Sequence, residues 1–253
     1  MTTPTVSADS YSSELNDLVR RVPVTQADAV RETAARFIAA LDRGGVIQAF
    51  GSGHSEAVAM EIAGRAGGLV PTNRLTLRDI VLYGGAPPSE LERYDLERDP
   101  SVARRILELA PVSPPDLFVV ISSSGVNGVV VELASLIKER GHELIAITSL
   151  AHSRAVSSRH PSGRKLYELA DVVLDNGAPY GDAVLPLPGG GAVGAVSTIT
   201  SALLAQLVVA EVVRHYLSLG EVPPLYLSAN VPGGDEHNLA LEARYSGRIR
   251  RGG

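Results

Sequence analysis

Short apolar runs alternate with longer amphipathic segments along most of the chain, and this order predicts an α/β fold. A weak strand is spread over 69–77, and four clearer β-branched runs indicate buried strands at 46–50, 117–121, 144–148 and 171–174. Helical spacing of apolar residues is clearest over 129–137, before Gly141. Because crossovers between parallel strands need helices, the pattern predicts a doubly wound, five-stranded parallel sheet covered on both faces.

The region before the first strand has the pattern of two helices. The second is expected to begin at Thr25, because Asp28 lies three residues on as in a capping box, and to end at Gly44 and Gly45. Three parts result: a helical segment at 1–45, the α/β domain at 46–240 with an insertion at 83–115, and a tail at 241–253. The proline-rich insertion is expected to lie on the surface and border the site, and the final SGRIRRGG to be disordered.

Two loops rich in glycine and serine each lie between a strand and a helix. The first loop is Gly51-Ser52-Gly53-His54-Ser55, and the second begins with Ser122-Ser123-Ser124-Gly125. Glycine lets the backbone turn sharply, and the following helix presents unpaired N–H groups to an anion. Since ligands of such sheets bind at the carboxyl ends of the strands, both loops together predict a phosphate site. Either loop alone could equally be an ordinary helix cap.

Several other binding and catalytic motifs are absent from the sequence. The first loop lacks the Gly-Lys-Ser/Thr of a Walker A loop, and Glu56 stands where a dinucleotide fingerprint has a small residue. No Gly-x-Ser-x-Gly elbow surrounds a loop serine, and no His-Glu-x-x-His pair is present. We therefore expect no nucleotide, no metal and no other cofactor.

Composition and charge predict where the protein is located and which partners it does not bind. The net charge of the 253 residues is −5 and the pI is near 5.7, so we expect binding neither to nucleic acid nor to a membrane surface. The chain has no cysteine and no basic-then-apolar leader, which favours a cytoplasmic protein. The apolar stretch 192–217 contains Ser197, Gln206 and Glu211, which indicates a buried or subunit-interface helix and not a membrane span.

The two loops resemble those of the SIS (sugar isomerase) domain, a flavodoxin-like fold found in phosphoheptose isomerases. The sequence ISSSGVN at 121–127 resembles the serine- and threonine-rich loop that holds the sugar phosphate in this family. The similarity continues through FGSGHSEAVAMEIAGRAGG, ITSLAHSRAVSSRHPSGRKLYELADVVLDNGAPYGDA and PPLYLSANVPGGDEHN, as in SIS-domain proteins named phosphoheptose isomerases. The resemblance implies a phosphosugar-binding protein, with isomerase activity as the expected function.

The resemblance also implies a set of binding residues. Phosphate binding falls to hydroxyls, amides and glycines of the two loops and of the next strand end: Gly51, Ser52, Gly53, Ser55, Ser122, Ser123, Ser124, Gly125, Asn127, Thr148 and Ser149. For Thr148 and Ser149, an ordinary cap is an equal alternative.

Isomerisation between an aldose and a ketose needs a base and an acid. Glu61 lies two turns after His54, so these two side chains are expected to face the site together, although Glu61 also has the spacing of an ion pair with Arg65. His237, in VPGGDEHN, is the second candidate for proton transfer, because such segments complete a neighbouring subunit's site in SIS enzymes. His160 is of similar standing.

The role of one residue is left open, and the sequence departs from the phosphoheptose isomerase pattern in two ways. Asp182 is either a turn residue or a ligand of sugar hydroxyls. Arg65 stands where, counting from the first glycine, phosphoheptose isomerases have a catalytic glutamate, and their zinc-binding histidines have no match here. The mechanism of that family is therefore not transferred as a whole.

We expect a homodimer or homotetramer, formed through the N-terminal helices and the apolar helix at 192–219. Two alternatives to an isomerase remain. One is a sugar-phosphate sensor without catalysis, and the other is a lyase or etherase acting on an amino-sugar phosphate, a reaction that also begins with proton abstraction.

Overall fold

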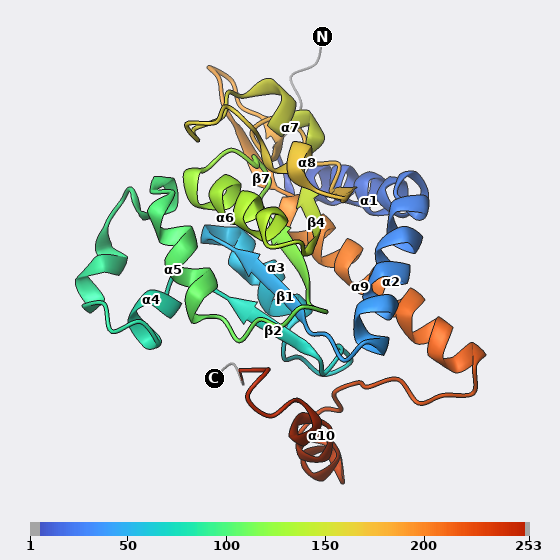
Figure 1. Cartoon of the computed structure of the whole chain (residues 1–253). Helices are drawn as coiled ribbons and strands as arrows, with labels where there is room; N and C mark the ends of the chain where they lie inside the picture. The colour runs from blue at the N-terminus through green and yellow to red at the C-terminus, as the bar shows by residue number, and fades with distance from the viewer. Residues whose placement is uncertain (1–5, 251–253) are drawn as a thin grey trace.

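Five parallel strands form the centre of the computed structural model, which describes residues 6–250 (Figure 1). They are β1 (Ile47–Gly51), β2 (Thr72–Leu75), β3 (Leu117–Ile121), β4 (Glu143–Thr148) and β5 (Val172–Asp175). Their order in the sheet is β2-β1-β3-β4-β5, the doubly wound order of a flavodoxin-like fold. The fold predicted from the apolar runs is confirmed.

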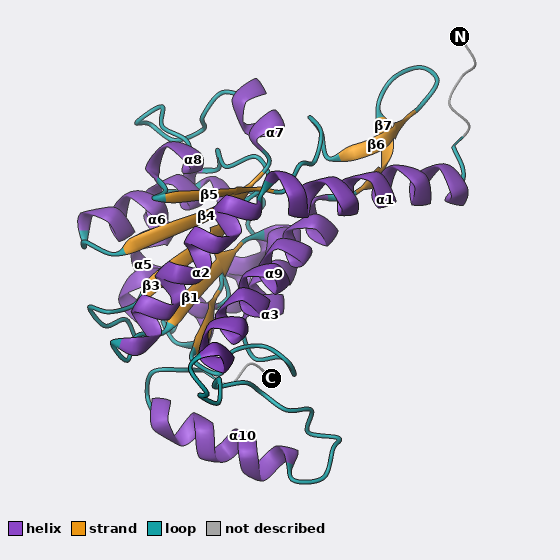
Figure 2. Ribbon diagram, turned by 90° about the vertical axis from the view of Figure 1, so that its right-hand side faces the viewer, coloured by secondary structure: helices purple, strands orange, loops and turns teal. Residues whose placement is uncertain are grey.

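Helices cover both faces of this sheet, as Figure 2 shows with the sheet seen nearly edge-on. One face is covered by α2 (Ala27–Asp42), α3 (Glu56–Ile62) and α9 (Ser197–Ser218), and the other by α5 (Ser101–Leu109), α6 (Gly128–Glu139) and α8 (Leu166–Leu169). The remaining helices are α1 (Ala8–Thr25), α4 (Asp79–Leu82), α7 (Leu150–Ala155) and α10 (Gly234–Glu242). The two layers explain why the central strands β1, β3 and β4 are buried almost throughout.

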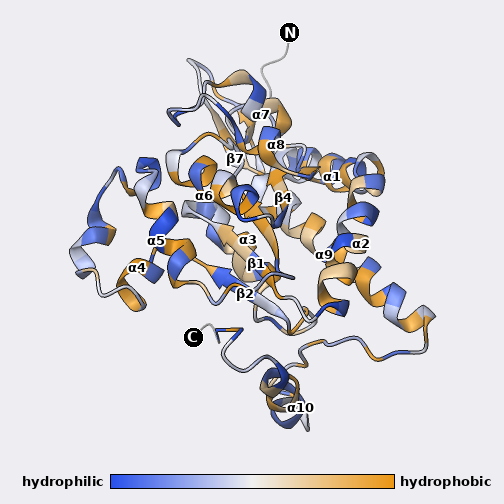
Figure 3. Ribbon diagram, in the orientation of Figure 1, coloured by the Kyte–Doolittle hydropathy of each residue, from blue (hydrophilic) through white to orange (hydrophobic). Residues whose placement is uncertain are grey.

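Alternate residues of each strand enter different cores. In β3, Leu117, Val119 and Ile121 pack towards α2 and α9, whereas Phe118 and Val120 pack towards α5 and α6. Figure 3 shows hydrophobic colours along much of the central sheet, whereas β2 at its edge is mostly hydrophilic.

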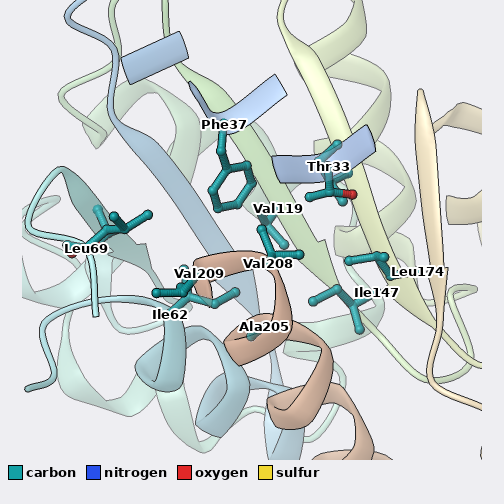
Figure 4. A pocket seen from close by; sticks show the side chains of 12 residues that line it. Thr33, Phe37, Ile62, Leu69, Val119, Ile147, Leu174, Ala205, Val208 and Val209 are labelled. Carbon is teal, nitrogen blue, oxygen red and sulfur yellow. Dashed lines mark hydrogen bonds between the residues drawn. The ribbon is translucent and has the colours of Figure 1, made fainter. Parts of the chain in front are cut away.

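Helix α9 is, among the described helices, the one long and apolar enough to cross a bilayer. Its Leu204, Val208 and Val212 are instead buried in the core against α2 and the sheet. A small apolar cavity of about 10 Å³ lies there, lined by Phe37, Val208 and other core residues (Figure 4). Thr33 also lines this cavity, and its buried hydroxyl has no hydrogen-bond partner.

The start of the second helix was predicted wrongly. Thr25 is the last residue of α1, where its hydroxyl donates to Val22 O (3.3 Å), and Gln26 separates α1 from α2. Pro23 lies within α1, in its last turn, so it does not end the helix early. Asp28 pairs with Arg31 and caps nothing.

Two segments of the C-terminal third were not anticipated. A β-hairpin, β6 (Ala183–Pro186) with β7 (Ala192–Ala195), extends beside α1, and α10 lies away from the sheet on a long connection (Figure 2). The segment after α10 returns to the sheet, where Arg248 pairs with Asp116 and Arg250 with Asp79. The disorder expected for the final stretch is therefore wrong as far as Arg250, and 251–253 lie outside the described residues.

Candidate functional site

The first loop makes a tight turn that only glycine permits. A Cβ on Gly51 would lie 2.3 Å from Ser55 O, and Gly53 has a φ of +55°. The turn continues into the 3-10 helix η1 (Gly53–Ser55) and then into α3. Ser52 and Ser55 are half-buried there, whereas His54 is exposed.

The second loop lies beside the first, because β1 and β3 are neighbours with Gly51 opposite Ile121. Ser122 Oγ accepts a hydrogen bond from Gly125 N (3.1 Å), and Gly125 has a φ of +64°. Ser124 is half-buried at the same loop. The structure thus brings the two loops together at the carboxyl edge of the sheet, as their positions in the sequence predicted.

A small polar cavity lies where the two loops meet the first turn of α9. Its volume is about 10 Å³, enough for about one water, and it is lined by Ser55, Val58, Ile121, Ser123, Asn176, Ser197, Thr198 and Ser201. Ser123 lines this cavity, and its Oγ is buried and has no hydrogen-bond partner. A buried hydroxyl left unpaired is costly, so a polar group from a ligand or water would be favoured here.

Asp182 fixes the position of this first turn of α9. Its carboxylate accepts from Val196 N (3.2 Å), Ser197 N (2.7 Å) and Ser197 Oγ (2.8 Å). Asp182 has a φ of +71°, so the chain adopts a left-handed turn to make this cap. The contribution of Ser197, Thr198 and Ser201 to this cavity was not predicted, because the polar residues of 192–217 were interpreted only as signs of a buried or subunit-interface helix.

Thr148 and Ser149, at the end of β4, hold the second loop in place by hydrogen bonds. Thr148 Oγ1 donates to Ser123 O (3.2 Å), and Ser149 N donates to the same oxygen (3.1 Å). The hydroxyl of Ser149 donates to Ala178 O (2.6 Å) and accepts from His152 N, which caps α7. Both side chains are fully buried, and their bonds are those of caps and loop supports.

The insertion at 83–115 borders both loops. Its 3-10 helix η3 (Leu96–Arg98) places Glu97 Oε1 3.0 Å from where a Cβ on Gly53 would lie. Glu97 Oε2 accepts from Asn127 Nδ2 (3.2 Å) at the N-terminus of α6. A Cβ on Gly128 would lie 2.1 Å from Arg98 O, so the insertion packs directly on that helix end. Glu97 was missed because nothing in its local sequence indicates this contact.

Glu61 lies on α3 with its carboxylate directed at α9. Gln206 Nε2 donates to Glu61 Oε1 (2.7 Å), and Arg65 pairs with the same oxygen. Glu61 and Gln206 therefore lie in the interface between α3 and α9. The polar cavity lies at the N-terminal end of both helices. His54 belongs to η1 and not to α3, so the structure does not bring His54 and Glu61 together as one helical face.

The two other histidines proposed from the sequence, His237 and His160, lie elsewhere. His237 is in α10, and its Nε2 bonds to Leu225 O (3.0 Å), next to the bridge from Leu225 to Leu69 just before β2. Within a single chain, His237 therefore lies towards the amino edge of the sheet, away from the two loops. His160 accepts at Nδ1 from Ser162 N (3.2 Å), so its Nε2–H donates to Glu132 Oε2 (2.8 Å).

Within residues 6–250, no group of three or more histidine, cysteine, aspartate or glutamate side chains is placed to hold a metal ion.

The chain is similar to proteins of one family. Residues 10–149 match the family model of the SIS domain. The UPF0309 protein lmo0025 of Listeria monocytogenes is 38% identical over 241 residues, 95% of this chain and 97% of that protein. The UPF0309 protein GK1441 of Geobacillus kaustophilus is 36% identical over 242 residues, 95% of each chain.

Solved structures show the same fold at lower identity. Phosphoheptose isomerase GmhA of Neisseria gonorrhoeae has a TM-score of 0.53 at 19% identity, covering 81% of this chain and 95% of that one. A phosphoheptose isomerase from Francisella tularensis has a TM-score of 0.51 at 14% identity, covering 81% and 96%. These two likenesses concern the fold alone.

Proposed function

Since the chain belongs to the SIS-domain family, we propose that it binds a phosphorylated sugar between the two loops and interconverts its aldose and ketose forms. The observation that most supports this is the buried, unpaired hydroxyl of Ser123 in a cavity lined mainly by hydroxyl groups. Phosphosugars present many oxygens: the phosphate oxygens accept hydrogen bonds, the sugar hydroxyls accept or donate, and one such group could bond to Ser123 Oγ.

The phosphate group is assigned to the second loop. The 12-residue helix α6 begins at Gly128, so its unpaired N–H groups and dipole favour an anion beside Ser122, Ser123, Ser124 and Gly125. Asn127 precedes the helix without capping it, and its side chain instead links Glu97 and Arg159 at the edge of the site. Ser52 and Ser55 complete the pocket from the first loop.

The base is assigned to Glu61. It lies five residues after Glu56, where α3 begins, which is about 8 Å along the helix axis from the first loop. The carbons that exchange a proton are at the end of the sugar remote from the phosphate, so a base is needed at some distance from the second loop. Gln206 holds the Glu61 carboxylate in place with a 2.7 Å hydrogen bond. Glu97 touches both loops and is better placed to bind sugar hydroxyls.

A second copy of the chain would complete this site. Met60 on α3 and Ile199 on α9 are 50% and 42% exposed beside the proposed path of the sugar, and apolar side chains there favour an interface. In a homodimer or homotetramer, His237 of a neighbouring copy would be available for proton transfer, and the exposed His54 is the acid candidate from the same chain. No metal ion or organic cofactor is part of this proposal.

The proposal is tested by proton NMR of the protein with six- and seven-carbon sugar phosphates in deuterated water. We expect loss of the signal next to the carbonyl together with an aldose–ketose shift. Glu61→Gln should slow this exchange about 10²- to 10⁴-fold, while Glu211→Gln, a control in an exposed pair with Arg214 on α9, should leave it unchanged. Exchange with elimination would instead indicate a lyase, and binding without exchange a sensor.

A further inference from the structure

Arg159 places a full positive charge at the rim of the second loop. Its backbone N–H donates to Val126 O (3.0 Å), and its Nη1 donates to Asn127 Oδ1 (3.3 Å). The side chain is exposed, and none of the ion pairs found among residues 6–250 includes it. The guanidinium has five N–H donors, so most of them remain available to a ligand at this loop.

Lys165 is another cation near the second loop, but its Nζ donates to Ser153 O (2.8 Å), whereas the Arg159 guanidinium is bonded to the loop itself through Asn127. Hydroxyls and backbone amides of the second loop supply only partial positive charges. Glu97 lies on the opposite side of Asn127, where its Oε2 accepts from Asn127 Nδ2 (3.2 Å). A phosphate dianion at the second loop would therefore meet a carboxylate at one side, and Arg159 is the cation placed to offset it.

We propose that Arg159 recognises the charge of the phosphate and makes the site selective for phosphate monoesters over neutral sugars. This inference rests on the proposed function. Asn127 holds the guanidinium at the loop in the free protein, and the backbone bond to Val126 keeps the residue anchored while the side chain turns towards the phosphate. A planar guanidinium can bind two phosphate oxygens at once, which lysine cannot do in the same way.

Titration calorimetry with inorganic phosphate, and then with the sugar phosphates of the panel, tests this role. Mildly alkaline pH keeps a monoester dianionic, because its second pKa is about 6. We expect Arg159→Gln to weaken binding about 10- to 100-fold and to reduce its salt dependence, with partial recovery in Arg159→Lys. The matched control is Arg164→Gln, because Arg164 lies in the same loop, is exposed and bonds to Glu168 O.

The possible results separate this inference from the proposed function. If the wild type binds the probes and Arg159→Gln binds them within about twofold of it, the role of Arg159 is refuted and the proposed function stands. Equal losses in Arg159→Gln and Arg164→Gln would also refute it, since the effect would then belong to the net charge of the loop. If the wild type binds neither inorganic phosphate nor any sugar phosphate, the proposed function fails first. Unchanged thermal unfolding of each variant excludes loss of folding as the cause.

Discussion

Replacing Arg250 by methionine is expected to destabilise the whole domain, although Arg250 is near the end of the chain. Its Nη1 lies 3.1 Å from Asp79 Oδ2, and the two side chains are 19% and 4% exposed. Its guanidinium also stacks on Tyr83 at 3.7 Å from the ring centroid, a contact that the methionine side chain partly keeps. The variant therefore removes mainly the charge that faces a buried carboxylate.

The expected loss follows from what remains around Asp79. Removing one partner of a buried ion pair costs about 3–5 kcal/mol. Asp79 retains its bond from Thr76 Oγ1 (3.0 Å) and can take up a proton, so we expect a loss of about 2–3 kcal/mol at neutral pH. For a domain of this size, that lowers Tm by about 4–12 °C.

The loss should depend on pH in a defined direction. Burial raises the pKa of Asp79 above the ordinary carboxyl value, while Thr76 and Arg250 oppose this shift. A carboxyl whose folded pKa is raised stabilises the fold below its unfolded pKa, and this stability is lost as pH rises through the folded pKa. Without Arg250 the folded pKa rises further, so the difference from the wild type should be large near pH 7 and small near pH 4.

Chemical denaturation of three variants across this pH range measures the effect. Asp79→Asn in the Arg250→Met background should recover most of the loss, because no buried charge is left. Arg244→Met, a change of an exposed arginine nearby, should stay within about 0.5 kcal/mol of the wild type. If Arg250→Met is as stable as Arg244→Met at neutral pH, the claim that the C-terminal segment packs on the domain through Arg250 is refuted.

Three further substitutions have expected outcomes that thermal and chemical unfolding can measure. Thr33→Val replaces a buried unpaired hydroxyl by a methyl group of similar shape and should raise stability by about 0.5–1 kcal/mol; a clear loss would mean that the hydroxyl is bonded. Gly128→Ala should cost about 1–3 kcal/mol, because its Cβ would lie 2.1 Å from Arg98 O, and it should also weaken phosphosugar binding; an unperturbed variant would show that the insertion does not pack there. Asp182→Ala removes the cap of α9 and should cost about 1–2 kcal/mol, whereas retention of full stability would contradict the capping role.

The sheet and the two loops could be predicted because their signals are local. An apolar run such as 117–121 indicates a strand buried on both faces. Glycines such as Gly51 and Gly125 indicate the turns that follow the strands. The carboxyl edge then follows from parallel topology alone. The positions of the first and second loops were available from the sequence for this reason.

The remaining parts of the site depend on contacts between distant segments. Glu97 reaches Asn127 across thirty positions, and Arg159 reaches it from the other direction. The first turn of α9 enters the cavity only because Asp182 caps it after a left-handed turn. The pairing of Arg250 with Asp79 spans 171 positions, so a short basic stretch looked like a disordered tail. Charge and polarity show which residues need partners, but the fold decides which partners they meet.

A crystal structure of the full chain with the tightest-binding sugar phosphate of the panel tests the central claim most directly. The account predicts the phosphate at the second loop, with one of its oxygens about 2.7–3.0 Å from Ser123 Oγ, and the reducing end of the sugar beside Glu61. A sugar phosphate bound at another face of the chain, or one whose reducing end lies away from Glu61, would contradict it.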